Sequence, residues 1–152
     1  MPEHVPLVEK TPERMRERPT WLLGQAYLRA AGLLQEGFAR GGDGLRGYHY
    51  RLLAALEEWG PASQAALGRS TGIDRSDVTA ALVDLEARGL VRRAVNQEDR
   101  RRNVVTITGE GVRHLELLDG VVDQIQEDLL APLSKEERQQ FMTLMRRIAG
   151  SP

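Results

Sequence analysis

Arginine side chains crowd one short stretch of this chain, because five of its arginines lie within residues 92–102. Three of them, Arg100, Arg101 and Arg102, are consecutive and follow Asp99. A guanidinium group can enter the narrow minor groove of duplex DNA, where the negative potential is enhanced. An aspartate two residues before an arginine can hold that long side chain by a charge-assisted hydrogen bond, which lowers the ordering cost of binding. Asp99 is therefore predicted to position Arg101 for a minor groove.

A second polar group lies upstream, at the start of a predicted helix. Arg75, Ser76 and Thr79 occupy its first exposed turns. A recognition helix enters the major groove by its N-terminal part, where arginine can pair with guanine and threonine can contact a thymine methyl group or a phosphate. The alternative is that Arg75 is a solvated residue that neutralises Asp74 and Asp77. Its place just before a basic hairpin favours the DNA contact.

Two short helices joined by a tight turn are predicted to position these side chains. Ser63 is a good N-cap for the first helix, and Gly72 can end it in the left-handed conformation. Asp74 then caps the second helix, with Asp77 three residues later as an acidic variant of a capping box. Gly89 ends that helix. Two helices with a glycine-containing turn between them form a helix–turn–helix.

The periodicity changes from helical to extended after Gly89. Residues 90–95 predict a strand, residues 96–103 a polar loop, and residues 104–108 a strand rich in β-branched side chains. A hairpin with a charged tip that directly follows a helix–turn–helix is a wing.

Longer amphipathic helices flank this central part. Apolar residues recur at helical spacing within residues 19–41, within residues 46–59 and from residue 109 to the break at Pro132. Ser134 and Glu137 form a capping box for a last helix. The long helix before Pro132 must bury its apolar face, which predicts a homodimer; packing of the last two helices within one chain is the alternative.

These elements predict a domain organisation. Residues 1–18 are charged, contain three prolines and are expected to form a flexible N-terminal arm. Residues 46–108 would form a winged helix–turn–helix lobe that binds DNA, and residues 19–45 and 109–150 would supply dimerisation helices. The expected fold class is mainly α with a small β-hairpin, a winged helix–turn–helix with N- and C-terminal dimerisation helices.

Composition narrows the function classes. The chain of 152 residues has a net charge of −1, but residues 62–108 carry eight arginines against six acidic groups. It has no cysteine, and its three histidines are scattered, so we expect no metal site, no cofactor and no enzyme. No apolar run reaches the roughly 18 residues of a membrane span, and no signal peptide is recognisable. We expect a cytoplasmic protein with no membrane partner.

The motifs resemble those of a known family. Residues 99–101, followed by 105–108 and Gly111, are similar to the wing signature of the MarR family of bacterial regulators. Residues 76–79 and 85–91 also match that family's recognition helix and its exit. The resemblance spans roughly residues 20–149 in the right order of elements.

The resemblance implies a triangular homodimer with interlocked terminal helices. Each recognition helix would enter a major groove, and each wing would reach the flanking minor groove. Arg101 would be the minor-groove residue and Asp99 its positioning partner, while Ser63 and Gln64 match positions that contact the phosphate backbone.

Members of the family often bind small aromatic molecules in a crevice between the dimerisation helices and the DNA-binding lobe. Candidate residues for such a crevice in this chain are Trp21, Tyr27, Tyr48, His49, Trp59 and His114, with Arg46 or Arg51 as partners for an anion. Each of these aromatic residues could instead pack in the core or on the surface. Trp59, at a helix end, is expected to pack behind the helix–turn–helix.

The expected function is that of a sequence-specific DNA-binding transcription regulator, a repressor. It would act as a homodimer on a palindromic operator in double-stranded DNA and respond to a small aromatic or anionic effector. The alternative is a winged-helix protein–protein interaction module, which would expose apolar residues on the second helix and the wing. The sequence places Arg75, Ser76 and Thr79 there, which favours DNA.

Overall fold

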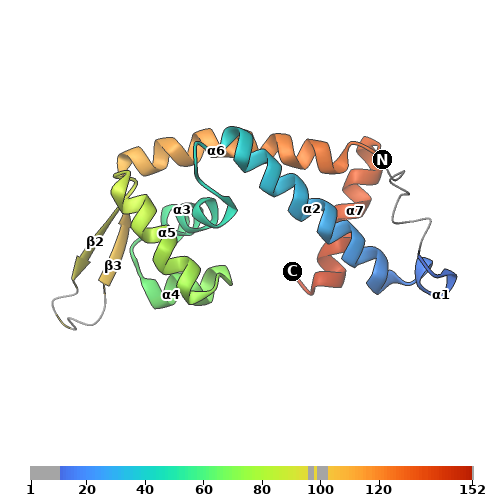
Figure 1. Cartoon of the computed structure of the whole chain (residues 1–152), viewed down its shortest axis with the longest axis horizontal. Coiled ribbons are helices and arrows are strands. Elements are labelled where there is room, and N and C mark those ends of the chain that lie inside the picture. The colour runs from blue at the N-terminus through green and yellow to red at the C-terminus, as the bar shows by residue number, and fades with distance from the viewer. Residues whose placement is uncertain (1–10, 96–97, 99–102, 152) are drawn as a thin grey trace, which may run out of the picture.

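The chain forms a small lobe of helices and strands at one end of a helical arm (Figure 1). The computed structural model describes residues 11–95, 98 and 103–151. Its elements in order are α1 (Glu13–Arg16), α2 (Pro19–Gly41), α3 (Gly47–Trp59), β1 (Ala62–Ser63), α4 (Gln64–Thr71), α5 (Arg75–Ala87), β2 (Val91–Val95), β3 (Asn103–Ile107), α6 (Gly109–Leu130) and α7 (Lys135–Ala149). The mainly helical fold class predicted from the sequence is confirmed.

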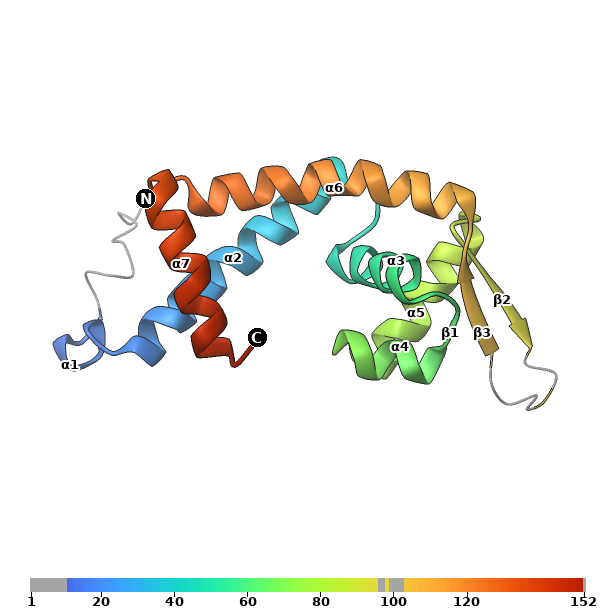
Figure 2. The ribbon, with the colours of Figure 1, turned by 180° about the vertical axis from the view of Figure 1, so that it is seen from behind.

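The lobe consists of α3, α4, α5 and a small sheet. The three strands run in the order β1-β3-β2, and both pairings are antiparallel (Figure 2). The sequence predicted only the hairpin of β2 and β3. It missed β1 because two residues, Ala62 and Ser63, are too few to show an alternating pattern.

A single aliphatic core holds the lobe together. The inner faces of α3 and α5 meet there, with Leu52, Leu56, Leu82 and Leu85 almost fully buried. Val105 of β3 closes the core from the sheet side. The recognition helix α5 is thus held by its inner face, and its outer face is left to solvent.

The helix ends follow the sequence signals, with one exception. Ser63 caps α4 by accepting a hydrogen bond from the backbone N–H of Ala66 at 3.2 Å, and Ser134 and Glu137 form the predicted capping box of α7. Asp74 caps α5 by accepting from the backbone N–H of Ser76 at 2.9 Å. The predicted capping box between Asp74 and the residue three positions later is therefore wrong.

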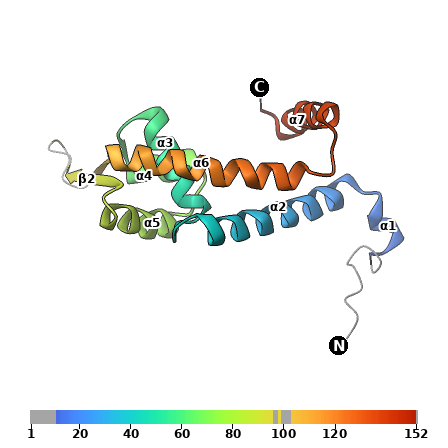
Figure 3. The same ribbon diagram turned by 90° about the horizontal axis from the view of Figure 1, so that it is seen from above.

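The arm consists of α2 and α6, which cross closely (Figure 3). Gly37 of α2 faces Ile125 of α6 so tightly that a Cβ on the glycine would lie 2.5 Å from the isoleucine side chain. Arg29 of α2 also donates hydrogen bonds to the carbonyl oxygens of Asp128 and Leu129, at the end of α6. These contacts fix the angle between the two long helices.

Helix α7 lies at the end of α6 that is far from the lobe, and Arg138 joins it to Glu127 of α6 by a hydrogen bond of 2.8 Å (Figure 3). It has no buried residue, and Leu144 and Ile148 are exposed although they lie on its apolar face. Packing of the last two helices against each other, the alternative left open by the sequence, therefore does not cover this face. At the other terminus, residues 1–10 lie outside the described part, and α1 forms one turn within the predicted flexible arm.

The start of α6 predicts a sharp difference between two glycine substitutions. A Cβ on Gly111 would overlap the backbone carbonyl oxygen of Leu90, whereas Gly120 on the same helix has open space around it. We expect Gly111→Ala to lower the free energy of unfolding by about 2–3 kcal/mol through overpacking. Gly120→Ala should raise it by roughly 0.5–1 kcal/mol through helix propensity. Urea unfolding measures both, and equal effects would contradict the close contact at Gly111.

Candidate nucleic-acid interface

A hydrogen-bonded chain joins the two helices of the helix–turn–helix on their polar side. The side-chain amide of Gln64, the first residue of α4, donates to the hydroxyl of Thr79 on α5 at 2.6 Å. That hydroxyl donates in turn to the backbone carbonyl oxygen of Arg75 at 3.0 Å. Two predicted DNA contacts, Gln64 and Thr79, therefore also hold α4 against the recognition helix.

The first turn of α5 carries the remaining predicted contacts of the recognition helix. Ser76 donates its hydroxyl to Asp74 at 2.6 Å, and the two hydrogen bonds from Ser76 hold the pKa of the Asp74 carboxyl below its usual range. Arg75 is exposed beside them, and its side chain makes no hydrogen bond or ion pair with another described residue. Arg75 is thus available to a ligand in front of the helix, and the surface around it is polar.

The wing is described in its strands but not at its tip. The predicted DNA contacts Arg100, Arg101 and Arg102 lie outside the described residues, as does Asp99, which is predicted to position Arg101. The two arginines of β2 differ from each other. Arg92 is exposed, whereas the side chain of Arg93 forms an ion pair with Glu86 of α5. This pair was not predicted, and its hydrogen bonds hold the pKa of the Glu86 carboxyl below its usual range.

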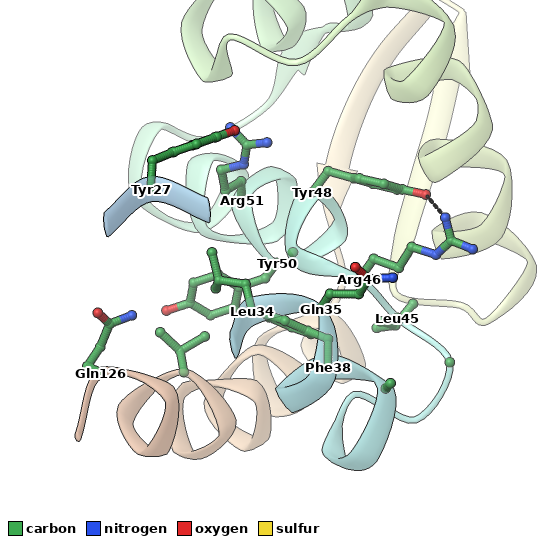
Figure 4. Close-up of a pocket in the computed structure, with 14 residues that line it drawn as sticks. Tyr27, Leu34, Gln35, Phe38, Leu45, Arg46, Tyr48, Tyr50, Arg51 and Gln126 are labelled. Atoms are coloured by element: carbon green, nitrogen blue, oxygen red, sulfur yellow. Dashed lines mark hydrogen bonds between the residues drawn. The ribbon is translucent and has the colours of Figure 1, made fainter. Parts of the chain in front are cut away.

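A pocket of about 980 Å³ lies between the arm and the lobe (Figure 4). Its wall comes from α2, from the loop before α3, and from α3 and α6. Of the predicted crevice residues, Tyr27 and Tyr48 line it, as do both predicted anion partners, Arg46 and Arg51. Trp21 does not line this pocket.

The pocket is aromatic and carries positive charge. Arg46 donates a hydrogen bond to the hydroxyl of Tyr48 at 3.3 Å, and no aspartate or glutamate is among the lining residues. Tyr50, which the sequence reading missed, also lines it and donates its hydroxyl proton to Asp119 of α6 at 2.6 Å. That hydrogen bond, together with burial, raises the pKa of Tyr50 to about 12. The pocket is therefore suited to a flat molecule with a negative charge.

His49, another predicted crevice residue, lies in the core beneath the pocket and is 2% exposed. Its Nδ1 accepts a hydrogen bond from the backbone N–H of Arg46 at 2.9 Å, so the ring proton must sit on Nε2. Nε2 then donates to a carboxylate oxygen of Asp84 on α5 at 3.2 Å. Burial lowers the pKa of His49, which keeps the ring neutral and ties α3 to the recognition helix.

Trp59 is not where the sequence reading placed it. Its side chain is 57% exposed at the end of α3, so the expectation that it packs behind the helix–turn–helix is wrong. The following Gly60 has φ of +84° and ends α3, so Trp59 is the last residue of the helix. His114 of α6 is half-buried and does not line the pocket.

Two helices in a helix–turn–helix, a β-wing and a flanking helical arm define the class of winged helix–turn–helix DNA-binding proteins. Within that class the chain belongs to the MarR family. The family's model matches residues 43–102, which span α3, α4, α5 and β2. The chain is therefore a DNA-binding transcriptional regulator and not an enzyme.

Relatives of known name share most of the chain. The HTH-type transcriptional repressor NicR of Pseudomonas putida is 30% identical over 150 residues, which cover 99% of this chain and 93% of the relative. The crystal structure of a probable transcriptional regulator from Pseudomonas aeruginosa is 34% identical, with a TM-score of 0.73 over 87% of this chain and 97% of that one.

A second similar structure belongs to a regulator whose DNA binding responds to a small molecule. BpsR of Bordetella bronchiseptica, described by a mechanism for regulation of its DNA binding by 6-hydroxynicotinic acid, has a TM-score of 0.73 at 27% identity. The match covers 84% of this chain and 96% of that one. Members of the family thus bind DNA, and some bind an aromatic acid as effector. Among the described helices of the present chain, none has the length and apolarity to cross a membrane.

The neutral, buried state of His49 predicts a pH dependence of stability. Its pKa in the folded chain lies below the unfolded value of 6.5, so the folded state binds fewer protons than the unfolded state. The stability that neutral His49 contributes is therefore lost as the pH falls below 6.5. We expect the free energy of unfolding to fall more steeply between pH 7 and pH 5 in the native chain than in His49→Asn. Urea unfolding at each pH gives both slopes, and parallel slopes would contradict a depressed pKa.

Proposed function

We propose that the chain is a repressor that binds a palindromic operator as a homodimer and is released by an aromatic acid. The observation that carries this proposal is the exposed, polar N-terminal turn of α5. A hydrogen bond joins this turn to α4, and a wing with a basic sequence follows α5 along the chain. An interaction module would expose apolar side chains at the same place. Val83 in the second half of α5 and Val95 at the end of β2 are exposed, but neither belongs to that turn.

The uncovered apolar surfaces of α2 and α7 support the homodimer. Large apolar side chains are exposed on α2 and α7, far from the lobe: Leu22, Leu23, Leu28, Met142, Leu144 and Ile148. Ile148 alone is 66% exposed, and an uncovered apolar helix face such as that of α7 is a feature of protein interfaces. A second copy of the chain presents the same face, so a two-fold axis through the arms would cover both.

A symmetric dimer has a direct consequence for the DNA. Two recognition helices related by a two-fold axis read two half-sites about one helical turn apart, so the operator repeats the protein's symmetry. Selection of bound sequences from random duplexes by the purified native chain tests this. We expect enrichment of a palindrome. Failure to enrich any motif would favour the protein–protein interaction module.

Arg101 is the residue on which the proposed minor-groove contact rests. Arg101→Ala should weaken binding of the selected duplex by roughly 1–3 kcal/mol, as for other specific arginine contacts, and should leave the fold unchanged. Arg40→Ala, an exposed arginine on α2, serves as the control and should bind like the native chain. Gel-shift titrations at one salt concentration measure both variants. Equal affinities for all three proteins would contradict the wing assignment.

The pocket is the proposed effector site because it combines tyrosines with two arginines and lacks acidic walls. We expect 6-hydroxynicotinic acid to bind there and to lower the affinity for the selected duplex. Arg46→Ala should weaken this binding by about 1.5–3 kcal/mol, the usual worth of a hydrogen bond to a charged group. Calorimetry with the acid and with its neutral amide is the measurement. Equal binding of the two ligands would contradict recognition of the negative charge.

A further inference from the structure

The carboxylate of Glu86 joins the recognition helix to the wing. Glu86 lies in the last turn of α5, and Arg93 lies in the middle of β2. One carboxylate oxygen accepts from the backbone N–H of Arg93 at 3.1 Å and from its Nε at 3.3 Å. The other oxygen accepts from Nη2 at 3.1 Å. A fork of this kind fixes direction as well as distance, which a single contact cannot do.

The position of Arg93 in the sheet explains why its backbone N–H is available. Strand β2 is at the edge of the sheet, because the order is β1-β3-β2. Arg93 is opposite Val105 of β3, yet its N–H bonds to Glu86 instead of to that strand. An edge strand leaves a row of such groups without a partner in the sheet. Glu86 satisfies one of them from outside the sheet.

The chain between α5 and β2 has its own, separate attachment. Gly89 makes the turn with φ of +70°, and its carbonyl oxygen accepts a hydrogen bond from the hydroxyl of Thr108 at 2.7 Å. The backbone N–H of Thr108 donates to the carbonyl oxygen of Leu90 at 3.0 Å. This attachment fixes where β2 begins. Glu86 holds the strand at a second point, and two points define the direction of the hairpin.

We propose that Glu86 is a positioning residue for DNA recognition, which fixes the direction of the wing relative to the recognition helix. The inference rests on the proposed docking of α5 and the wing in neighbouring grooves. Glu86 itself carries the charge that DNA repels, so it acts through Arg93 and not by contact. Correspondingly, Arg93 is occupied within the protein, whereas Arg92 on the same strand is exposed and faces no such partner among the described residues.

The charge of Glu86 makes this role separable from electrostatics. Glu86→Gln removes one negative charge from the DNA-binding lobe, so by charge alone it should tighten binding to every duplex. Loss of the fixed wing direction should instead weaken binding, and only to a duplex that contacts the recognition helix and the wing together. The ratio of specific to non-specific affinity therefore distinguishes positioning from charge. The side chains of Glu86 and Arg93 are 41% and 23% exposed, so these substitutions leave the core intact.

The test compares Glu86→Gln, Arg93→Gln, the double variant and Arg92→Gln on the selected duplex and on an unrelated duplex of equal length. We expect Glu86→Gln to bind the selected duplex with about tenfold lower affinity, which is within the range of coupling in one ion-pair network. Its affinity for the unrelated duplex should not fall. The double variant should lose no more than Arg93→Gln. Arg92→Gln, the matched control, should weaken both duplexes alike. Unchanged or tighter specific binding by Glu86→Gln overturns the proposal.

Hydrogen exchange without DNA supplies a second, independent readout. In Glu86→Gln the amides of β2 should exchange at least about fivefold faster, while those of the buried face of α5 stay protected. Unchanged exchange in β2 overturns the anchoring role whatever the DNA result. Absence of any selected duplex with the native chain would count against the proposed function, and the exchange result would still decide whether Glu86 holds the wing.

Discussion

The close crossing of α2 and α6 is the constraint on which the rest of the structure depends. Gly37 lets Ile125 approach the backbone of α2, and Gly41 does the same for Val121. Arg29 adds hydrogen bonds to the last carbonyl groups of α6. Because this crossing fixes the arm, it also fixes the pocket in the angle between the arm and α3, and the distance between the lobe and the exposed apolar face.

Several polar groups of the DNA-binding lobe have a partner within the protein. Gln64 and Thr79 bind each other, and His49 reaches α5 through Asp84. Arg88 at the end of α5 donates to the carbonyl oxygen of Asp43, at 2.6 Å, in the loop that also lines the pocket. The lobe is thus organised before it meets DNA, which lowers the ordering cost of binding. The loop before α3 contacts both the pocket and the recognition helix.

Sequence reasoning predicted the features that depend on neighbours along the chain. Helix ends such as Ser63 and Gly72 were identified because a cap needs only a few consecutive residues. Features that depend on tertiary contacts were missed. Strand β1 pairs with a strand some 40 residues away, and no sequence pattern around Trp59 indicates that its side chain is exposed. The Glu86–Arg93 ion pair was not predicted because a cluster of arginines in a sequence does not show which of them pairs with a carboxylate. The wing-tip contacts remain predictions.

Helix α6 is one continuous helix that connects the two ends of the molecule. One residue separates it from β3, and it ends shortly before α7. Its 22 residues span about 33 Å. If α6 is treated as straight, a tilt of about five degrees at the end near α7 displaces its other end, next to the wing, by about 3 Å. In the proposed homodimer, the angle at which the two copies meet would therefore set the separation of the two wings, and a small change in that angle would be larger at the DNA.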